Sequence, residues 1–92
     1  DGLVIVVTTV DGSSGMVLAG PDIVTRGFVY VRESEELLEG VRSAVREMLG
    51  GLNRREMLDH STVKMKIRET VSSYLYRKTK RSPMILPIIM EI

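Results

Sequence analysis

The 92-residue sequence contains no cysteine, no tryptophan and a single histidine, His60. Without cysteine the chain can form neither a disulfide framework nor a thiolate metal site, which favours a reducing, cytoplasmic environment. Zinc and two-metal sites need three or more convergent ligands, so one histidine beside Asp59 is expected to cap a helix or to face solvent. We therefore predict no metal and no cofactor in this chain.

Long hydrophobic runs are absent too. No apolar stretch reaches the roughly 18–20 residues that a membrane helix needs, and no signal-peptide pattern is present, so no membrane partner is expected. Aromatic residues make up only 4% of a chain that is 43% hydrophobic, which leaves the core of one small domain to aliphatic side chains and methionine. Because Asp1-Gly2 leads at once into a strand-like run, we expect a domain cut from a longer protein.

Motifs for catalysis are also missing. The glycine-rich residues 12–15 lack the lysine and the following helix of a phosphate-binding loop. Four glutamates gather at residues 33–39, where the dipole of a predicted helix explains them without catalysis. No nucleophile has a base beside it. We predict no catalytic residue, and we expect the isolated domain to be inactive.

A β-hairpin is predicted at the start of the chain. Residues 3–10 form a nearly unbroken β-branched run that is apolar on both faces, as in a buried strand. Residues 11–15 contain an Asp-Gly pair typical of hairpin turns. The second strand is expected at residues 16–19 and continues through residues 23–24 beyond a kink at Gly20-Pro21.

The segment of residues 20–34 is predicted to carry the chain from the sheet to the first helix. Its β-branched and aromatic residues favour strand geometry, and Arg26-Gly27 places an arginine at a bend. We expect Arg26, Phe28 and Tyr30 to set this route and to reach a neighbouring domain.

Two amphipathic helices follow. The first is expected to begin near Ser34 as N-cap and to end at Gly50-Gly51. Its apolar stripe is predicted to contain Leu37, Leu38, Val41, Ala44, Val45, Met48 and Leu49. Gly40 lies inside this helix, which suggests a close approach by another element.

The second helix follows a polar connection at residues 52–61 that has room for a short helical turn. Asp59, Ser61 and Thr62 are each suitable caps. Its stripe is predicted to contain Val63, Ile67, Val71, Tyr74, Leu75 and the aliphatic stem of Lys78. Residues 84–92 predict a third strand, which must be an edge strand or bulged because Pro87 cannot donate to a ladder.

The predicted order is therefore ββααβ, an α+β fold with a three-stranded sheet and two helices packed on one face. Two helices cover only one face, yet the first and third strands are apolar on both. Large exposed apolar patches usually mark interfaces. We predict a partner surface for another domain or a second copy, and its candidate residues are Arg26, Phe28, Tyr30, Ile85, Leu86 and Ile88.

The net charge of +1 hides an asymmetry along the chain. Residues 1–32 carry −1, residues 33–59 carry −3 and residues 60–92 carry +5. Either the acidic first helix pairs with the basic second one, or the basic segment faces a polyanion. The candidate RNA contacts are Arg77, Lys78, Lys80 and Arg81, just after Tyr74 and Tyr76. The alternative is a solvated helix end, where positive charge suits the dipole.

Four short segments carry a resemblance to a known family. They are residues 20–30 (Gly-Pro-Asp-Ile-Val-Thr-Arg-Gly-Phe-Val-Tyr), 32–34 (Arg-Glu-Ser), 76–81 (Tyr-Arg-Lys-Thr-Lys-Arg) and 83–87 (Pro-Met-Ile-Leu-Pro). Together they resemble the C-terminal domain of bacterial ribonuclease J, a metallo-β-lactamase and β-CASP ribonuclease. The similarity extends over essentially the whole chain.

This resemblance implies a parent protein that is a zinc-dependent ribonuclease with endonucleolytic and 5′-to-3′ exonucleolytic activity in RNA processing and decay. It implies that zinc is bound by a catalytic domain absent from this chain, so residues 1–92 are a single accessory domain. In the family, this domain supports oligomer assembly and full activity. The implied partners are the other domains of the same enzyme, further copies in a homodimer or higher homo-oligomer, and the parent's RNA substrate.

Three hypotheses follow for the chain. The leading one is an accessory domain that supports oligomerisation. The second is an RNA-binding module that uses the basic end of the second helix. The third is a structural cap that docks only on its own chain.

Overall fold

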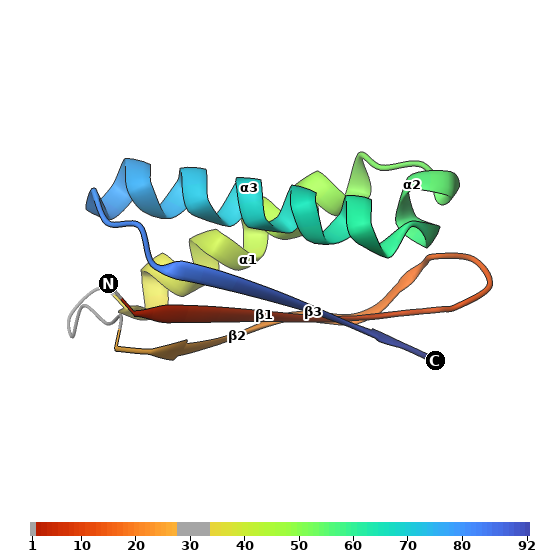
Figure 1. Ribbon diagram of the computed structural model, residues 1–92, viewed down its shortest axis with the longest axis horizontal. Coiled ribbons are helices and arrows are strands. Elements are labelled where there is room, and N and C mark those ends of the chain that lie inside the picture. Colours follow the sequence, from red (N-terminus) through yellow and green to blue (C-terminus); the bar gives the residue numbers. More distant parts are fainter. Residues whose placement is uncertain (1, 28–33) are drawn as a thin grey trace.

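In the computed structural model, which describes residues 2–27 and 34–92, a three-stranded sheet carries its helices on one face (Figure 1). The strands are β1 (Leu3–Val10), β2 (Val17–Arg26) and β3 (Met84–Glu91). β1 lies in the centre, antiparallel to β2 and parallel to β3, in the order β2-β1-β3. The predicted hairpin is therefore confirmed, and the third strand pairs with the first.

Two prolines mark the two edges of this sheet. Val7 pairs with Asp22 and Thr9 with Ala19, so the single residue between them on β1 lies opposite both Gly20 and Pro21. This bulge is the predicted kink, and β2 continues beyond it. On β3, Pro87 lies opposite Val6 in unbroken register. The expectation of an edge strand is confirmed, since a residue on an edge can lack an N–H donor without loss to the ladder.

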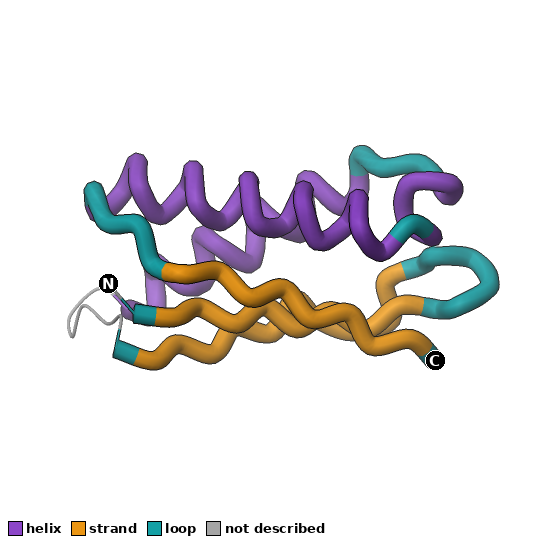
Figure 2. Tube along the Cα trace, viewed as in Figure 1, coloured by secondary structure: helices purple, strands orange, loops and turns teal. Residues whose placement is uncertain are grey.

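The helices are α1 (Ser34–Gly50), α2 (Arg54–Leu58) and α3 (His60–Thr79). Figure 2 shows α1 and α3 as a single layer over the sheet. The predicted ββααβ order is confirmed, with α2 as a short addition inside the polar connection. α2 begins with a capping box: the Glu56 N–H donates to Asn53 Oδ1 at 2.8 Å, and the Asn53 N–H donates to Glu56 Oε1 at 3.0 Å.

The core lies between the helices and one face of the sheet. Both predicted helical stripes face it, with Val41, Val45 and Leu49 buried on α1 and four aliphatic residues buried on α3: Val63, Ile67, Val71 and Leu75. The close approach predicted at Gly40 is present, because a Cβ atom there would overlap the Tyr74 hydroxyl. All of this core is supplied by the chain itself.

Lys78 is a correction to the predicted stripe. Its side chain is exposed, and its Nζ lies 5.7 Å from the centre of the Tyr74 ring. The buried stripe of α3 ends instead at Leu75. An ammonium group is strongly hydrated, so the last turn of the helix keeps it in water and places it over an aromatic face.

Candidate interaction surfaces

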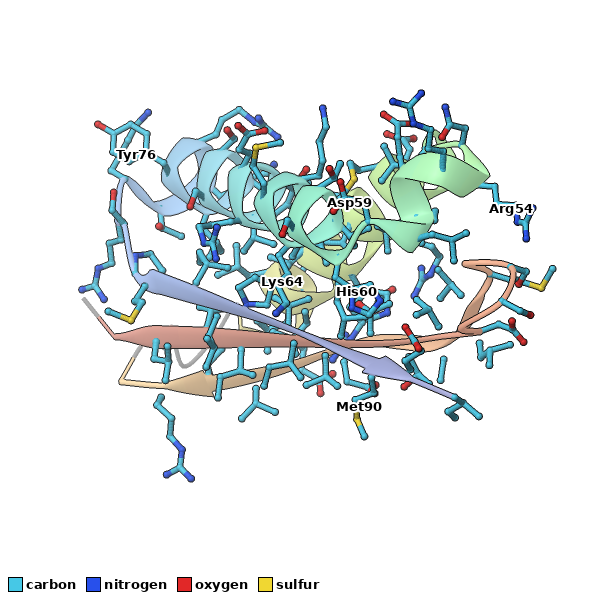
Figure 3. The ribbon with its side chains drawn as sticks, turned by 45° about the vertical axis from the view of Figure 1, so that its right-hand side comes forward. Arg54, Asp59, His60, Lys64, Tyr76 and Met90 are labelled. Carbon is cyan, nitrogen blue, oxygen red and sulfur yellow. The ribbon has the colours of Figure 1, made fainter. Side chains whose placement is uncertain are left out.

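The second face of the sheet is not covered by any described helix. We call it the open face and define it by the side chains that alternate with the core positions: Leu3, Ile5 and Val7 on β1, Val24 on β2, and Met84, Leu86, Ile88 and Met90 on β3. On its β3 side, Met84 is 70% exposed and Met90 is 55% exposed. Figure 3 shows Met90 pointing away from the helices.

Strand register gathers these side chains into one patch. Residues that pair across two strands share a face, so Ile5 lies beside Leu86 and Val7 lies beside Ile88. On the other side, Ile5 pairs with Val24 of β2. The patch therefore crosses all three strands without a charged residue at its centre.

Charge appears only at the β2 margin of the open face. Asp22 pairs with Val7, and Arg26 pairs with Leu3, which puts both charged side chains on the open side of the sheet. Both are exposed. They lie four residues apart on one strand and have opposite signs.

The candidate interface residues divide into three groups. Arg26, Leu86 and Ile88 lie on the open face, as described above. Ile85 does not: it is 6% exposed and packs in the core, since it pairs with Val4 on the helix side. Phe28 and Tyr30 lie outside the described residues. Met84 and Met90 are not among the predicted residues, although strict alternation along β3 separates them from Ile85. The open-face residues of the other two strands are also not among them: Leu3, Ile5, Val7 and Val24.

The basic cluster lies at the last turn of α3, on the opposite layer of the molecule from the open face. Arg77, Lys78 and Lys80 are exposed, and each lies over a tyrosine ring. The Arg77 guanidinium is 5.5 Å from the centre of the Tyr74 ring, and Lys80 Nζ is 5.4 Å from that of Tyr76. Figure 3 shows Tyr76 at the outer end of the helix.

The backbone holds this cluster in place where α3 ends. Lys80 adopts the left-handed conformation, with φ 60° and ψ 24°, and its N–H donates to the Tyr76 carbonyl at 2.8 Å. The Thr79 hydroxyl donates to the Leu75 carbonyl at 2.7 Å and accepts from the Arg81 N–H at 3.1 Å. These bonds satisfy carbonyls that a helix end leaves unpaired, and they bring Arg81 next to the other three cations.

Comparison with known proteins decides the family. The family model described as "Ribonuclease J C-terminal domain" matches residues 1–92, which is the whole chain. The chain belongs to this family. The predicted resemblance is thereby confirmed over its full length.

Two relatives of this ribonuclease J C-terminal domain illustrate the similarity. The chain is 46% identical over 92 residues to ribonuclease J2 of Bacillus subtilis strain 168, and it is fully covered while spanning 17% of that relative. It is 44% identical over 92 residues to ribonuclease J 2 of Staphylococcus aureus strain NCTC 8325 / PS 47, again fully covered and spanning 16% of that relative. The chain therefore corresponds to about a sixth of the length of these relatives.

The described residues of this family member can be searched for metal ligands. Within residues 2–27 and 34–92, no three side chains of histidine, aspartate or glutamate come together as a metal site would require. His60 Nε2 lies 3.1 Å from Glu91 Oε1 and so connects the start of α3 with the end of β3. The N-cap position belongs to Asp59, whose Oδ2 accepts from the Thr62 hydroxyl at 2.9 Å. The residues described here do not fit a zinc centre.

The described helices bear on two further features of the sequence. Of the two alternatives for the charge asymmetry, pairing of α1 with α3 is not seen, since no ion pair joins these helices among the described residues. Arg42 of α1 instead pairs with Glu39 of the same helix at 2.9 Å. In the described part of the chain, no helix has both the length and the apolar character to cross a membrane.

Proposed function

We propose that this domain holds copies of a larger ribonuclease together through its open face and carries no catalytic residue itself. The observation that supports this is an apolar patch crossing three strands with no helix over it. Charge is depleted at the centre of protein–protein interfaces, and exposed apolar patches of this kind usually mark them. The patch is therefore suited to permanent contact with protein.

The occupant of the open face is a second copy of this domain. A two-fold contact must be self-complementary, because the same patch meets itself. Asp22 and Arg26 lie four residues apart on one strand, so a two-fold axis between them brings the carboxylate of one copy to the guanidinium of the other. The apolar β3 side chains then meet their own counterparts.

The chemistry of RNA cleavage belongs, in this proposal, to the rest of the parent protein. Both relatives are named ribonucleases, and the chain spans about a sixth of their length. Zinc, endonucleolytic and 5′-to-3′ exonucleolytic activity are proposed for that missing part. The domain contributes by setting the distance and orientation between catalytic units.

The test measures the oligomeric state of the full-length protein by sedimentation. Leu86→Asp places a charge on the open face and is expected to convert the oligomer to monomer. Met65→Asp is the matched control, because Met65 on α3 is exposed to the same 44% as Leu86 and should leave assembly intact. An oligomer that survives Leu86→Asp, or a wild-type protein that is monomeric at high concentration, contradicts the proposal.

Charge exchange tests the two-fold arrangement separately. Arg26→Asp should weaken assembly, Asp22→Arg should do the same, and the double variant should restore it, because opposite charges again meet across the axis. Zinc content should stay unchanged in all three. Failure of the double variant to recover assembly contradicts the two-fold contact.

A second function, RNA binding, is favoured by the exposed end of α3. Tyr76 is 53% exposed beside Lys80, which provides a ring for base stacking next to a cation for phosphate. Replacing Arg77 and Lys80 with glutamine should flatten the slope of log affinity against log salt for a single-stranded oligonucleotide. Glutamine at Lys64 and Lys66 of the same helix is the control. No binding at low salt contradicts this function.

A further inference from the structure

A third feature lies apart from both surfaces, at the end of the molecule where the hairpin loop meets α2. A cleft of about 520 Å³ opens between the start of β2 and the end of α1. This volume is within the range of about 300–1,000 Å³ that is typical of ligand sites. Its floor and walls are mostly apolar and include Val17, Pro21, Leu49, Leu52 and Met57.

The last residue of α1 is a glycine that leaves open space at the cleft. Gly50 lines it, and no atom lies within 4 Å of the position where a Cβ would be. The chain then turns away toward α2, with the Leu52 N–H donating to the Leu49 carbonyl at 3.1 Å. At the other side Gly15 packs tightly on Met57, since a Cβ at Gly15 would lie 2.8 Å from the Met57 Cβ. The space is thus bounded by fixed elements.

The charge that the described residues bring to the cleft is positive. Arg46 and Arg54 both line it, and no described aspartate or glutamate does. Arg54 is held in place, because its Nη2 donates to the Ser13 carbonyl at 2.8 Å. Arg46 is exposed and makes no hydrogen bond or ion pair with the residues that the structure describes. Figure 3 shows Arg54 at the hairpin end of the molecule.

The residues that line the cleft favour a peptide over a nucleic acid as its ligand. Among the described residues, no aromatic ring lines the cleft, whereas single-stranded nucleic acid is usually held by bases stacked on aromatic side chains. Aliphatic and methionine side chains adapt well to the apolar side chains of a protein. β2 is also an edge strand, and an extended peptide can lie along such an edge.

We propose that this cleft binds an acidic peptide segment of a partner protein. Aliphatic side chains of the segment fill the space beside Leu49 and Met57, and its carboxylates pair with Arg46 and Arg54. Charge-assisted pairs with arginine are strong and directional, so they set the register of the segment. This site is separate from the open face and does not depend on assembly.

The test uses a fluorescent peptide in which leucine alternates with glutamate and aspartate, blocked at both ends. Its binding to the 92-residue chain, whose core is self-contained, is followed by anisotropy. One comparison peptide carries lysine in place of the acids, and another carries alanine in place of leucine. Only the first peptide should bind, and its affinity should fall as salt rises. Equal binding of all three peptides, or of none, overturns the proposal.

Two matched pairs of variants locate the binding. Gly50→Trp should fill the cleft and abolish binding, whereas Gly51→Trp should not, because Gly51 is not among the lining residues. Arg54→Glu should weaken binding about tenfold, and Arg55→Glu on the same short helix should leave it unchanged. Binding that survives Gly50→Trp, or that a single-stranded RNA of similar length abolishes by competition, overturns the proposal. Unchanged sedimentation of Gly50→Trp in the full-length protein separates this result from the assembly test.

Discussion

Neighbouring residues on β3 have opposite surroundings: Ile85 is 6% exposed beneath the helices, whereas Leu86 is 44% exposed on the open face. Both are aliphatic and both belong to one strand. Burying such a side chain contributes about 1.5–3 kcal/mol. On the covered face this free energy already stabilises the fold, and on the open face it remains available for association. The covered face therefore supplies stability, and the open face is the surface that we propose for assembly.

The largest expected difference between the two faces is in how much a substitution lowers the free energy of unfolding. Ile85→Ala should lower the free energy of unfolding of the 92-residue chain by about 2–5 kcal/mol, because it leaves a cavity in the core. Leu86→Ala should lower it by less than about 1 kcal/mol in dilute solution, since the removed atoms already contact water. Urea denaturation measures both. Equal losses of unfolding free energy in the two variants would mean that the open face is covered, and would contradict the difference between the two faces.

A smaller effect is expected from two adjacent threonines of β1. Thr8 is fully buried on the covered face, and its Oγ1 has no hydrogen-bond partner among the described residues. Thr8→Val should therefore raise stability by about 1 kcal/mol, because it removes an unsatisfied buried hydroxyl. Thr9→Val on the open side is the control and should change stability by less than about 0.5 kcal/mol. A loss of stability in Thr8→Val would mean that the hydroxyl is satisfied.

The smallest effect concerns the hairpin loop, which joins β1 to β2 and belongs to neither face. The Ser13 hydroxyl donates to Asp11 Oδ1 at 2.6 Å, and the backbone N–H groups of Ser14 and Ser13 add further bonds, which lower the Asp11 pKa to about 2. Because the folded pKa is below the ordinary 3.8, this stabilisation is present above about pH 4 and is lost as pH falls toward 2.

Asp11→Asn should remove that pH dependence and lower stability slightly at neutral pH, because the neutral amide oxygen accepts weaker hydrogen bonds than the carboxylate. An NMR titration of the Asp11 carboxyl measures the pKa directly, and urea midpoints at pH 6 and pH 2.5 measure the linkage. A titration midpoint at the ordinary value would contradict the prediction. Since the loop is exposed, Asp11→Asn should not alter the packing of either sheet face. Large chemical-shift changes in the strand residues of this variant would also contradict the prediction.

Local sequence signals predicted most of the elements, and the predictions that failed did so for physical reasons. The continuation of the second strand beyond Gly20-Pro21 is predictable because turn residues and β-branched runs act locally. The helix α2 carries its own signal, since Asn53 followed three residues later by Glu56 is a capping box. Only a short helical turn is predicted in this connection, although this signal is present there. Lys78 was misplaced because helical periodicity alone does not say where the covered stripe ends.

The candidate sites were less predictable. The basic residues 77–81 could be found from composition because four cations within five residues must gather at one helix end. The cleft beside Gly50 could not be found, since its walls come from residues 14–21 and 46–57, far apart in the sequence. Ile85 was assigned to the interface because an apolar strand does not reveal which of its faces the helices will cover.

By itself, the sequence determined the hairpin, most of the two helical stripes, the restriction of Pro87 to an edge or a bulge, and the existence of an uncovered apolar face. Each follows from local backbone chemistry or from counting apolar faces against the helices available. Only the tertiary structure decided that β3 pairs parallel to β1, that Leu86 rather than Ile85 faces outward, and that two arginines share a cleft. These depend on register and on contacts between distant segments, and a one-residue change of register would exchange the two faces of a strand.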